Sequence, residues 1–150
     1  MKVLFHIPEK IFMKTGKIFV DTNIWIYSFV KTDNVKHLIA KELIEYNIKR
    51  IIINSQIINE LCYNLIRKSL FTEDQIQKLT SSMFSLFTIN NYQLNHYLSA
   101  SNLRDKYKFS FWDSLIVASA LEANCSILYS EDMHNGTVIN NTLKIINPFN

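Results

Sequence analysis

The chain has 150 residues, of which 48% are hydrophobic and 13% aromatic, and this length suits one domain with a sizeable core. Its formal net charge of +3 is compatible with a polyanionic partner, but it is far below the charge density that identifies a nucleic-acid-binding protein by itself. No apolar run approaches the roughly 20 residues of a membrane-spanning helix, so we expect a soluble protein without a membrane partner.

The first residues do not form a secretion signal. In "MKVLFHIPEKIF", Pro8 and Glu9 interrupt the apolar residues, and no cleavage site of small residues follows. Met13 then begins a compact approach to the first strand. We therefore predict an N-terminal extension of uncertain role over residues 1–12 and one domain over residues 13–150.

The two cysteines indicate a reducing environment. Cys62 and Cys125 lie in apolar helical patterns, and they do not have the CxxC spacing of a metal or redox site. We expect both to be free thiols in a cytoplasmic protein.

Strand-like and helix-like hydrophobic patterns alternate along the chain. In chain order they predict a strand at 17–20, a helix that begins at the polar turn 21–23, a helix at 35–47, a strand at 50–55, helices at 55–69 and 73–87, a strand at 87–90, helices at 91–108 and 110–125, and strands at 126–130 and 143–149. Short, unbroken apolar strands separated by helices are typical of a parallel sheet covered on both faces. The fold class is therefore predicted to be α/β, with a short parallel sheet flanked by helices in a single domain.

Four acids fall where such a fold places its ligands, in the crevice beyond the carboxyl ends of the strands. Asp21 ends the first strand, and Glu60 lies in the early turns of the helix after the second strand. Asp113 lies in the first turn of the helix at 110–125, and Asp132 follows the strand at 126–130. All four are expected at the same edge of the sheet.

Each acid also has a purely structural explanation. Asp21 could cap the following helix, Glu60 could be an ordinary exposed helical residue, and Asp132 could belong to a turn. Ser110 and Asp113 have the spacing of a capping box. These explanations are reasonable one by one, but they do not explain why the acids recur at one edge of the sheet.

Close carboxylates imply a metal ion. Within about 4–6 Å of one another they repel, unless a cation lies among them. Oxygen ligands without Cys or His favour Mg²⁺ or Mn²⁺ over zinc. Such an ion can activate water for attack on a phosphodiester, so the pattern indicates nuclease chemistry.

Three stretches, "FVDTNIWIYSF", "SQIINEL" and "FSFWDSLIVASALEANCSILYSEDM", resemble the PIN-domain ribonucleases, and the length and spacing resemble their VapC-type toxin members. The resemblance covers residues 17 to about 147. It implies that the metal-binding and catalytic acids are Asp21, Glu60, Asp113 and Asp132. It also implies that Asn23 and Ser130 orient a carboxylate, a water molecule or a phosphate beside them.

The same resemblance implies an activity and partners. The expected activity is an endoribonuclease that depends on Mg²⁺ or Mn²⁺, hydrolyses RNA and leaves a 5′-phosphate. The expected partners are the RNA substrate, a VapB-type antitoxin whose C-terminal segment occupies the active-site groove, and a second copy in a homodimer. Glu131 is an additional acid to which the resemblance gives no role.

Basic residues before Asp113 are candidates for RNA contact. Arg104, Lys106 and Lys108 could meet phosphates at the rim of the groove, although a solvated, charged helix end would have the same composition. Trp25 and Trp112 are expected in the core rather than as stacking platforms for bases.

Two other classes remain open. One is another Mg²⁺-dependent α/β phosphohydrolase or phospho-acceptor domain, which would require a second acid where this chain has Asn23. The other is a PIN-like binding module without catalysis, against which the intact set of four acids argues.

Overall fold

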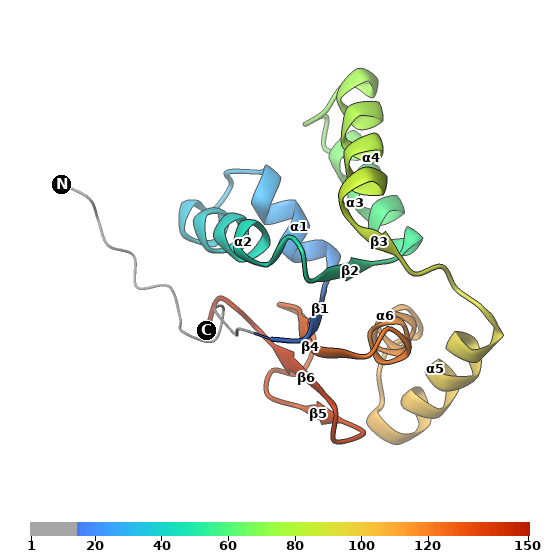
Figure 1. The fold of residues 1–150 in the computed structure, drawn as a ribbon. Helices are drawn as coiled ribbons and strands as arrows, with labels where there is room; N and C mark the ends of the chain where they lie inside the picture. Colours follow the sequence, from blue (N-terminus) through green and yellow to red (C-terminus); the bar gives the residue numbers. More distant parts are fainter. Residues whose placement is uncertain (1–14) are drawn as a thin grey trace.

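The computed structural model describes residues 15–150, and the predicted extension over residues 1–12 lies outside them. Its elements in chain order are β1 (Lys17–Val20), α1 (Thr22–Phe29), α2 (Asn34–Asn47), β2 (Ile51–Ile53), α3 (Ser55–Arg67), α4 (Glu73–Leu86), β3 (Thr88–Ile89), α5 (Leu94–Tyr107), α6 (Phe111–Glu122), β4 (Cys125–Tyr129), β5 (Val138–Ile139) and β6 (Leu143–Ile146) (Figure 1). Every predicted strand and helix has its counterpart in this order. In the described part of the chain, no helix has both the length and the apolar character that a membrane crossing needs.

The six strands form one sheet in the order β3-β2-β1-β4-β6-β5. All neighbouring pairs are parallel except β5 and β6, which are antiparallel. The predicted α/β class is therefore confirmed, and the expectation of a purely parallel sheet needs a correction at one edge. The two-residue strand β5 has no detectable period, and the hairpin to β6 is formed by Asn140 and Asn141, whose φ angles are 48° and 59°.

Helices cover both faces of this sheet. Figure 1 shows α1 and α2 on one side of the strands and α5 and α6 on the other, with the α3–α4 pair extending beyond the β2–β3 edge. The chain builds outwards from β1 through β2 to β3, then returns to place β4 on the other side of β1. A crevice at the carboxyl ends of β1 and β4 is the expected ligand site of such a sheet, because the strand order reverses there.

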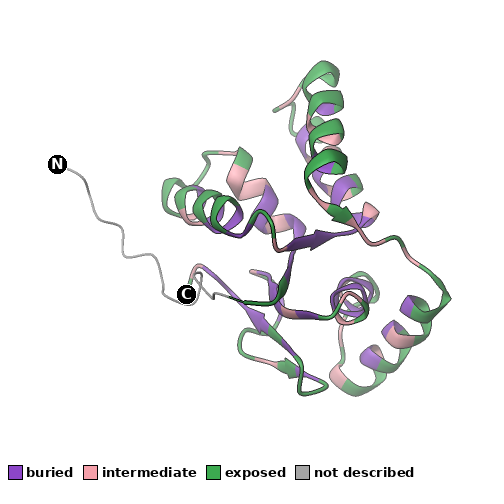
Figure 2. Ribbon diagram, viewed as in Figure 1, coloured by how far each residue is buried: buried purple, intermediate pink, exposed green. Residues whose placement is uncertain are grey.

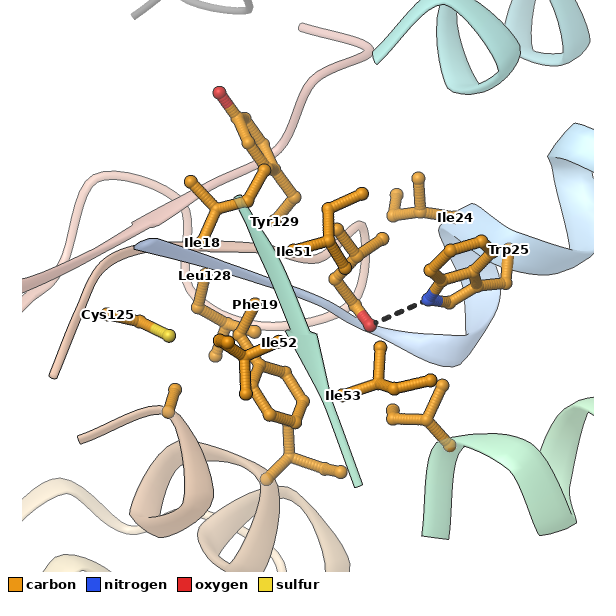
Figure 3. Close-up of a cluster of buried hydrophobic side chains, with 14 of the residues drawn as sticks. Ile18, Phe19, Ile24, Trp25, Ile51, Ile52, Ile53, Cys125, Leu128 and Tyr129 are labelled. Carbon is orange, nitrogen blue, oxygen red and sulfur yellow. Dashed lines mark hydrogen bonds between the residues drawn. The ribbon is translucent and has the colours of Figure 1, made fainter. Parts of the chain in front are cut away.

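The hydrophobic core is centred on β1. Ile18, Phe19 and Val20 have no exposed surface and belong to one buried cluster. Figure 3 shows Ile18 and Phe19 among side chains of β2 and β4. The strands β1, β2, β4 and β6 and the helix α6 are buried along most of their length, whereas α4 and α5 are exposed on their outer faces (Figure 2). Burial on both faces explains why these strands are unbroken apolar runs.

Candidate functional site

The parallel strands all end in a polar residue at the same edge of the sheet. The residues that follow β1, β2, β3, β4 and β6 are Asp21, Asn54, Asn90, Ser130 and Asn147. Val20 pairs with Tyr129 in the register of β1 and β4, and the Asp21 amide donates to the Tyr129 carbonyl at 2.9 Å. Asp21 and Ser130 are therefore neighbours, as the sequence predicts for the ends of parallel strands.

Asp21 is a buried carboxylate held by three donors, two from α1 and one from the residue after β4. One oxygen, Oδ1, accepts a hydrogen bond from the Thr22 amide at 2.8 Å, so Asp21 does cap the start of α1. The other, Oδ2, accepts from Ser130 Oγ at 2.8 Å and from Asn23 Nδ2 at 3.5 Å. Only 8% of the residue is exposed. The capping role and the buried position at the strand end thus coexist.

Burial changes the proton affinity of this carboxyl. Burial has the largest effect and raises the pKa of Asp21, the hydrogen bonds from Ser130 and Thr22 lower it, and the negative charges of Asp113 and Glu60 raise it. The net result is a pKa of about 6 in place of the ordinary 3.8. Asp113 and Glu60 therefore lie close enough to Asp21 to disfavour its charged form. A cation at this position would favour the charged form of Asp21.

Glu60 is oriented by polar neighbours from two elements. Thr22 Oγ1 donates to Glu60 Oε2 at 2.8 Å, and Gln56 Nε2 donates to Glu60 Oε1 at 2.6 Å. The Tyr92 hydroxyl in turn donates to Gln56 Oε1. Thr22 thus links the first turn of α1, next to Asp21, to the second turn of α3. Sequence reasoning did not identify Thr22, Gln56 or Tyr92, because their roles arise only when α1, α3 and the segment before α5 come together.

Asp132 joins the same group through Asn23. The Asn23 side-chain amide donates to Asp132 Oδ2 at 3.0 Å, and its Oδ1 accepts from the Glu131 amide at 3.4 Å. Asn23 therefore bridges Asp21 and Asp132, and the orienting role expected for it stays a prediction. Asp132 itself is exposed, so its carboxylate faces solvent at the rim of the site.

Asp113 occupies the first turn of α6. Its amide donates to Ser110 Oγ at 3.1 Å, which is one half of the predicted capping box. Within residues 15–150 the Asp113 carboxylate accepts no hydrogen bond, so the reciprocal half is not formed. Capping therefore does not use this carboxylate, which remains available for another role.

The donor set fits a hydrated hard cation. Its side chains offer carboxylate, hydroxyl and amide oxygens, which suit Mg²⁺ or Mn²⁺. Within residues 15–150, no three His, Cys, Asp or Glu side chains lie close enough together to hold one metal ion directly. Mg²⁺ usually keeps several waters and binds through one or two carboxylates, so this spacing is compatible with it. That all four acids serve one metal site stays a prediction.

A comparison with protein-family models identifies the family of the domain that carries these residues. The PIN domain model matches residues 18–134, which include all four acids. This chain belongs to the PIN domain family. The predicted family is confirmed, and its members are typically ribonucleases that depend on a metal.

Several solved structures have a similar fold, and three of them come from different bacteria. A toxin–antitoxin complex from Klebsiella pneumoniae has a TM-score of 0.66 at 20% identity, over 89% of this chain and 98% of the other. VapC20 of Mycobacterium tuberculosis, a sarcin-ricin loop cleaving toxin, has a TM-score of 0.63 at 16% identity, over 75% and 87%. VapBC2 of Rickettsia felis, bound to a DNA fragment from its promoter, has a TM-score of 0.60 at 21% identity, over 87% and 98%. A comparison with curated proteins gives no match.

Glu131, which had no assigned role, makes a structural ion pair in this PIN domain. Its carboxylate pairs with Lys36 Nζ, which also lies 4.9 Å from the centre of the Tyr27 ring. The hydrogen bond to Glu131, followed by one to Tyr27, raises the pKa of Lys36. Glu131 therefore ties the loop after β4 to α2, and it supports the position of its neighbour Asp132.

The candidate RNA-contact residues differ in their surroundings. Arg104 is half-buried, and its Nη1 donates to Ser114 Oγ at 2.9 Å. Lys106 and Lys108 are exposed, and Lys108 Nζ donates to the Asp105 carbonyl at 2.6 Å near the end of α5. Arg104 thus braces α5 against α6, and contact of these three residues with RNA stays a prediction.

The structure corrects the expected place of one tryptophan. Trp25 is 3% exposed and belongs to the core, as predicted. Trp112, also predicted in the core, is 62% exposed. Because α6 is apolar on nearly all sides, its sequence does not show that its first turn projects beyond the sheet.

Both cysteines are free, as predicted. Cys125 is buried at the start of β4, whereas Cys62 is only half-buried in α3. Burial raises the pKa of the Cys125 thiol to about 12, so this thiol is unreactive at neutral pH.

Replacing Ser130 tests the electrostatics of the site. Ser130→Ala removes the hydroxyl that donates to Asp21, so we expect the pKa of Asp21 to rise above about 6. At about pH 8 the variant should lose roughly 1–3 kcal/mol of stability without metal, since the buried carboxylate loses a hydrogen bond. Chemical denaturation at about pH 5 and pH 8 measures this. The loss should shrink at pH 5, where the protonated carboxyl needs the donor less. An equal loss at both values would show that Ser130 acts only through packing.

Proposed function

We propose that this chain is an endoribonuclease that depends on Mg²⁺ or Mn²⁺ and hydrolyses phosphodiester bonds of RNA. The observation that carries the proposal is the buried Asp21 carboxylate at the strand-order reversal, with its pKa raised to about 6 and with the charges of Glu60 and Asp113 acting on it. A buried acid near other acids is costly for stability, and such cost is typical of functional sites. Membership of the PIN domain family supports the same conclusion.

The residues have distinct roles in this proposal. Asp21, Glu60, Asp113 and Asp132 would hold the cation, which when bound activates water and stabilises the charge that develops on the phosphate. Thr22 and Gln56 hold Glu60 in place, and Asn23 keeps Asp132 beside Asp21. Ser130 keeps the buried Asp21 carboxylate oriented.

We further propose that the protein acts as the toxin of a toxin–antitoxin pair in the cytoplasm, as a homodimer inhibited by a VapB-type antitoxin. The support is the likeness of fold to a toxin–antitoxin complex and to a VapC toxin. Co-expression with the protein encoded by the neighbouring gene, followed by co-purification, tests the partner separately from the activity.

The activity is tested by incubating purified protein with labelled RNA and Mg²⁺. We expect endonucleolytic cleavage that EDTA abolishes, with 5′-phosphate ends in the product. Glu60→Gln should reduce the rate by at least about 100-fold, since it removes one of the negative charges that would hold the cation at the reacting phosphate. Glu122→Gln, at an exposed position on α6, is the matched control and should cleave like wild type.

The two alternative classes predict different results. A catalytically silent module would bind RNA but release no product at any metal concentration. Another Mg²⁺-dependent phosphohydrolase would release phosphate from small phosphomonoesters and leave RNA intact.

A further inference from the structure

An aromatic groove opens beside Glu60, between α3 and α6. It has a volume of about 720 Å³, and its lining includes Glu60 together with Tyr63 and Trp112. Phe111, Tyr92 and Tyr97 supply further rings. The mechanism above uses Glu60 and Gln56 of this lining and gives no role to the rings of Tyr63, Phe111 and Trp112, so these rings need a separate explanation.

Two of these rings are exposed to an unusual degree for their size. Trp112 is 62% exposed and Tyr63 is 64% exposed. Phe111 supports Trp112 from the side, with ring centres 5.1 Å apart and planes at 88°. A supported ring with open surface can accept a flat partner at little cost in conformational entropy.

Two arginine side chains lie against aromatic rings that line the groove. The Arg104 guanidinium is 5.0 Å from the centre of the Phe111 ring, and the Arg67 guanidinium is 6.0 Å from the centre of the Tyr63 ring. Arg67 and Arg104 therefore flank the aromatic surface from α3 and α5. Rings for stacking and cations for phosphates are the two components of single-stranded nucleic-acid sites.

We propose that this groove binds unpaired RNA bases by stacking, with Trp112 and Tyr63 as the platforms for bases next to the cleaved phosphate. The proposal rests on the proposed nuclease function, because the groove and the acids share Glu60. Ser55 and Asn59 add a hydroxyl and an amide to the same lining, which can reach base edges. A duplex does not fit this surface, because its bases are already stacked on one another.

The chain contains only two tryptophans, which makes the proposal directly measurable. Trp25 is buried, so a change in tryptophan fluorescence on adding RNA reports on Trp112. In EDTA, where hydrolysis is prevented, we expect a single-stranded RNA of about ten nucleotides to quench this fluorescence. The same sequence in a duplex should quench it much less. Absence of quenching by the single strand would overturn the proposal.

Substitutions separate stacking from general effects on the fold. Trp112→Ala should weaken binding of the single strand by roughly 5- to 150-fold, the loss expected for one base–aromatic stack. Trp112→Phe should bind nearly as well as wild type but show no quenching. Phe84→Ala, which removes an exposed ring of α4 outside the groove, is the matched control and should bind like wild type. Equal binding by Trp112→Ala and wild type would overturn the proposal.

Another occupant of the groove would give a different signature. If a second copy covers it, the Trp112 fluorescence should become shielded from acrylamide as protein concentration rises without RNA, and Trp112→Ala should dissociate the dimer. That outcome overturns the proposal.

Cleavage assays distinguish this proposal from the proposed function. Metal-dependent cleavage that is equally fast in wild type and Trp112→Ala would contradict the stacking proposal and would still support the nuclease function. Quenching by single-stranded RNA without cleavage at any Mg²⁺ concentration would contradict the proposed nuclease function and would still support the stacking site.

Discussion

Asp21→Asn is expected to reduce metal-dependent RNA cleavage by at least about 100-fold, because it removes the negative charge at the centre of the site. Asp21 contacts Asn23 and Ser130, and the charges of Glu60 and Asp113 act on it. No other acid of the site has as many hydrogen bonds and charge interactions with the remaining site residues. A variant that cleaves as fast as wild type would contradict the proposed mechanism.

The same substitution should have the opposite effect on stability without metal. The pKa of Asp21 is about 6 in the folded protein and 3.8 in its ordinary state, so this group favours folding below about pH 4 and loses that contribution as the pH rises through 6. A shift of this size corresponds to roughly 3 kcal/mol at about pH 8. Asn has no such charge, although it accepts one hydrogen bond fewer. In EDTA at pH 8, Asp21→Asn should therefore melt at the same temperature as wild type or several degrees higher.

Thermal denaturation in EDTA and in Mg²⁺, at about pH 5 and pH 8, checks this expectation. Mg²⁺ should stabilise wild type more than the variant and reverse their order, because only the folded wild type binds the ion well. Asp33→Asn is the matched control, since Asp33 caps the exposed start of α2 and Asn caps a helix equally well. A variant that melts well below wild type in EDTA would show that capping of α1 dominates the role of Asp21.

Local patterns predicted most of the framework around this site. The alternation of short apolar runs with helical periods was enough for the α/β class, because strands buried on both faces and separated by helices have few other solutions. Parallel strands end at one edge, so the four acids could be expected at that edge, whereas the adjacency of β1 and β4, which places Ser130 beside Asp21, came only from the structure. Asn23 followed from its position two residues after Asp21 in the family pattern.

Contacts between distant elements could not be predicted in the same way. The pair between Lys36 and Glu131 joins α2 to the loop after β4, and neither residue has a local signature. Thr22 is part of the predicted polar turn, but its bond to Glu60 depends on how α1 and α3 pack. Trp112 was misplaced for a related reason, since burial of a ring depends on the neighbours that cover it rather than on its own helix.

Trp25→Ala is expected to cause the largest loss of stability among the substitutions considered. Trp25 is 3% exposed, its indole Nε1 donates to the Val20 carbonyl at 3.1 Å, and its ring packs edge-on against Phe87 at 5.2 Å between centres (Figure 3). It therefore joins the end of β1, the first turns of α1 and the segment after α4. Truncation of a buried aromatic ring to Ala costs about 3–5 kcal/mol.

A loss of that size is a large fraction of the 5–15 kcal/mol typical of a domain, so the variant should be partly unfolded or strongly sensitive to urea. Circular dichroism is the suitable probe, because the remaining Trp112 is exposed in both states. Trp25→Phe keeps most of the ring and loses only the bond to Val20, so its loss should be clearly smaller. Because Asp21 to Asn23 lie in the turn that Trp25 fixes to β1, the Ala variant should also lose cleavage at temperatures where it remains folded. A loss below about 1 kcal/mol would mean that neighbouring side chains collapse into the space, and α1 would then be held by other contacts.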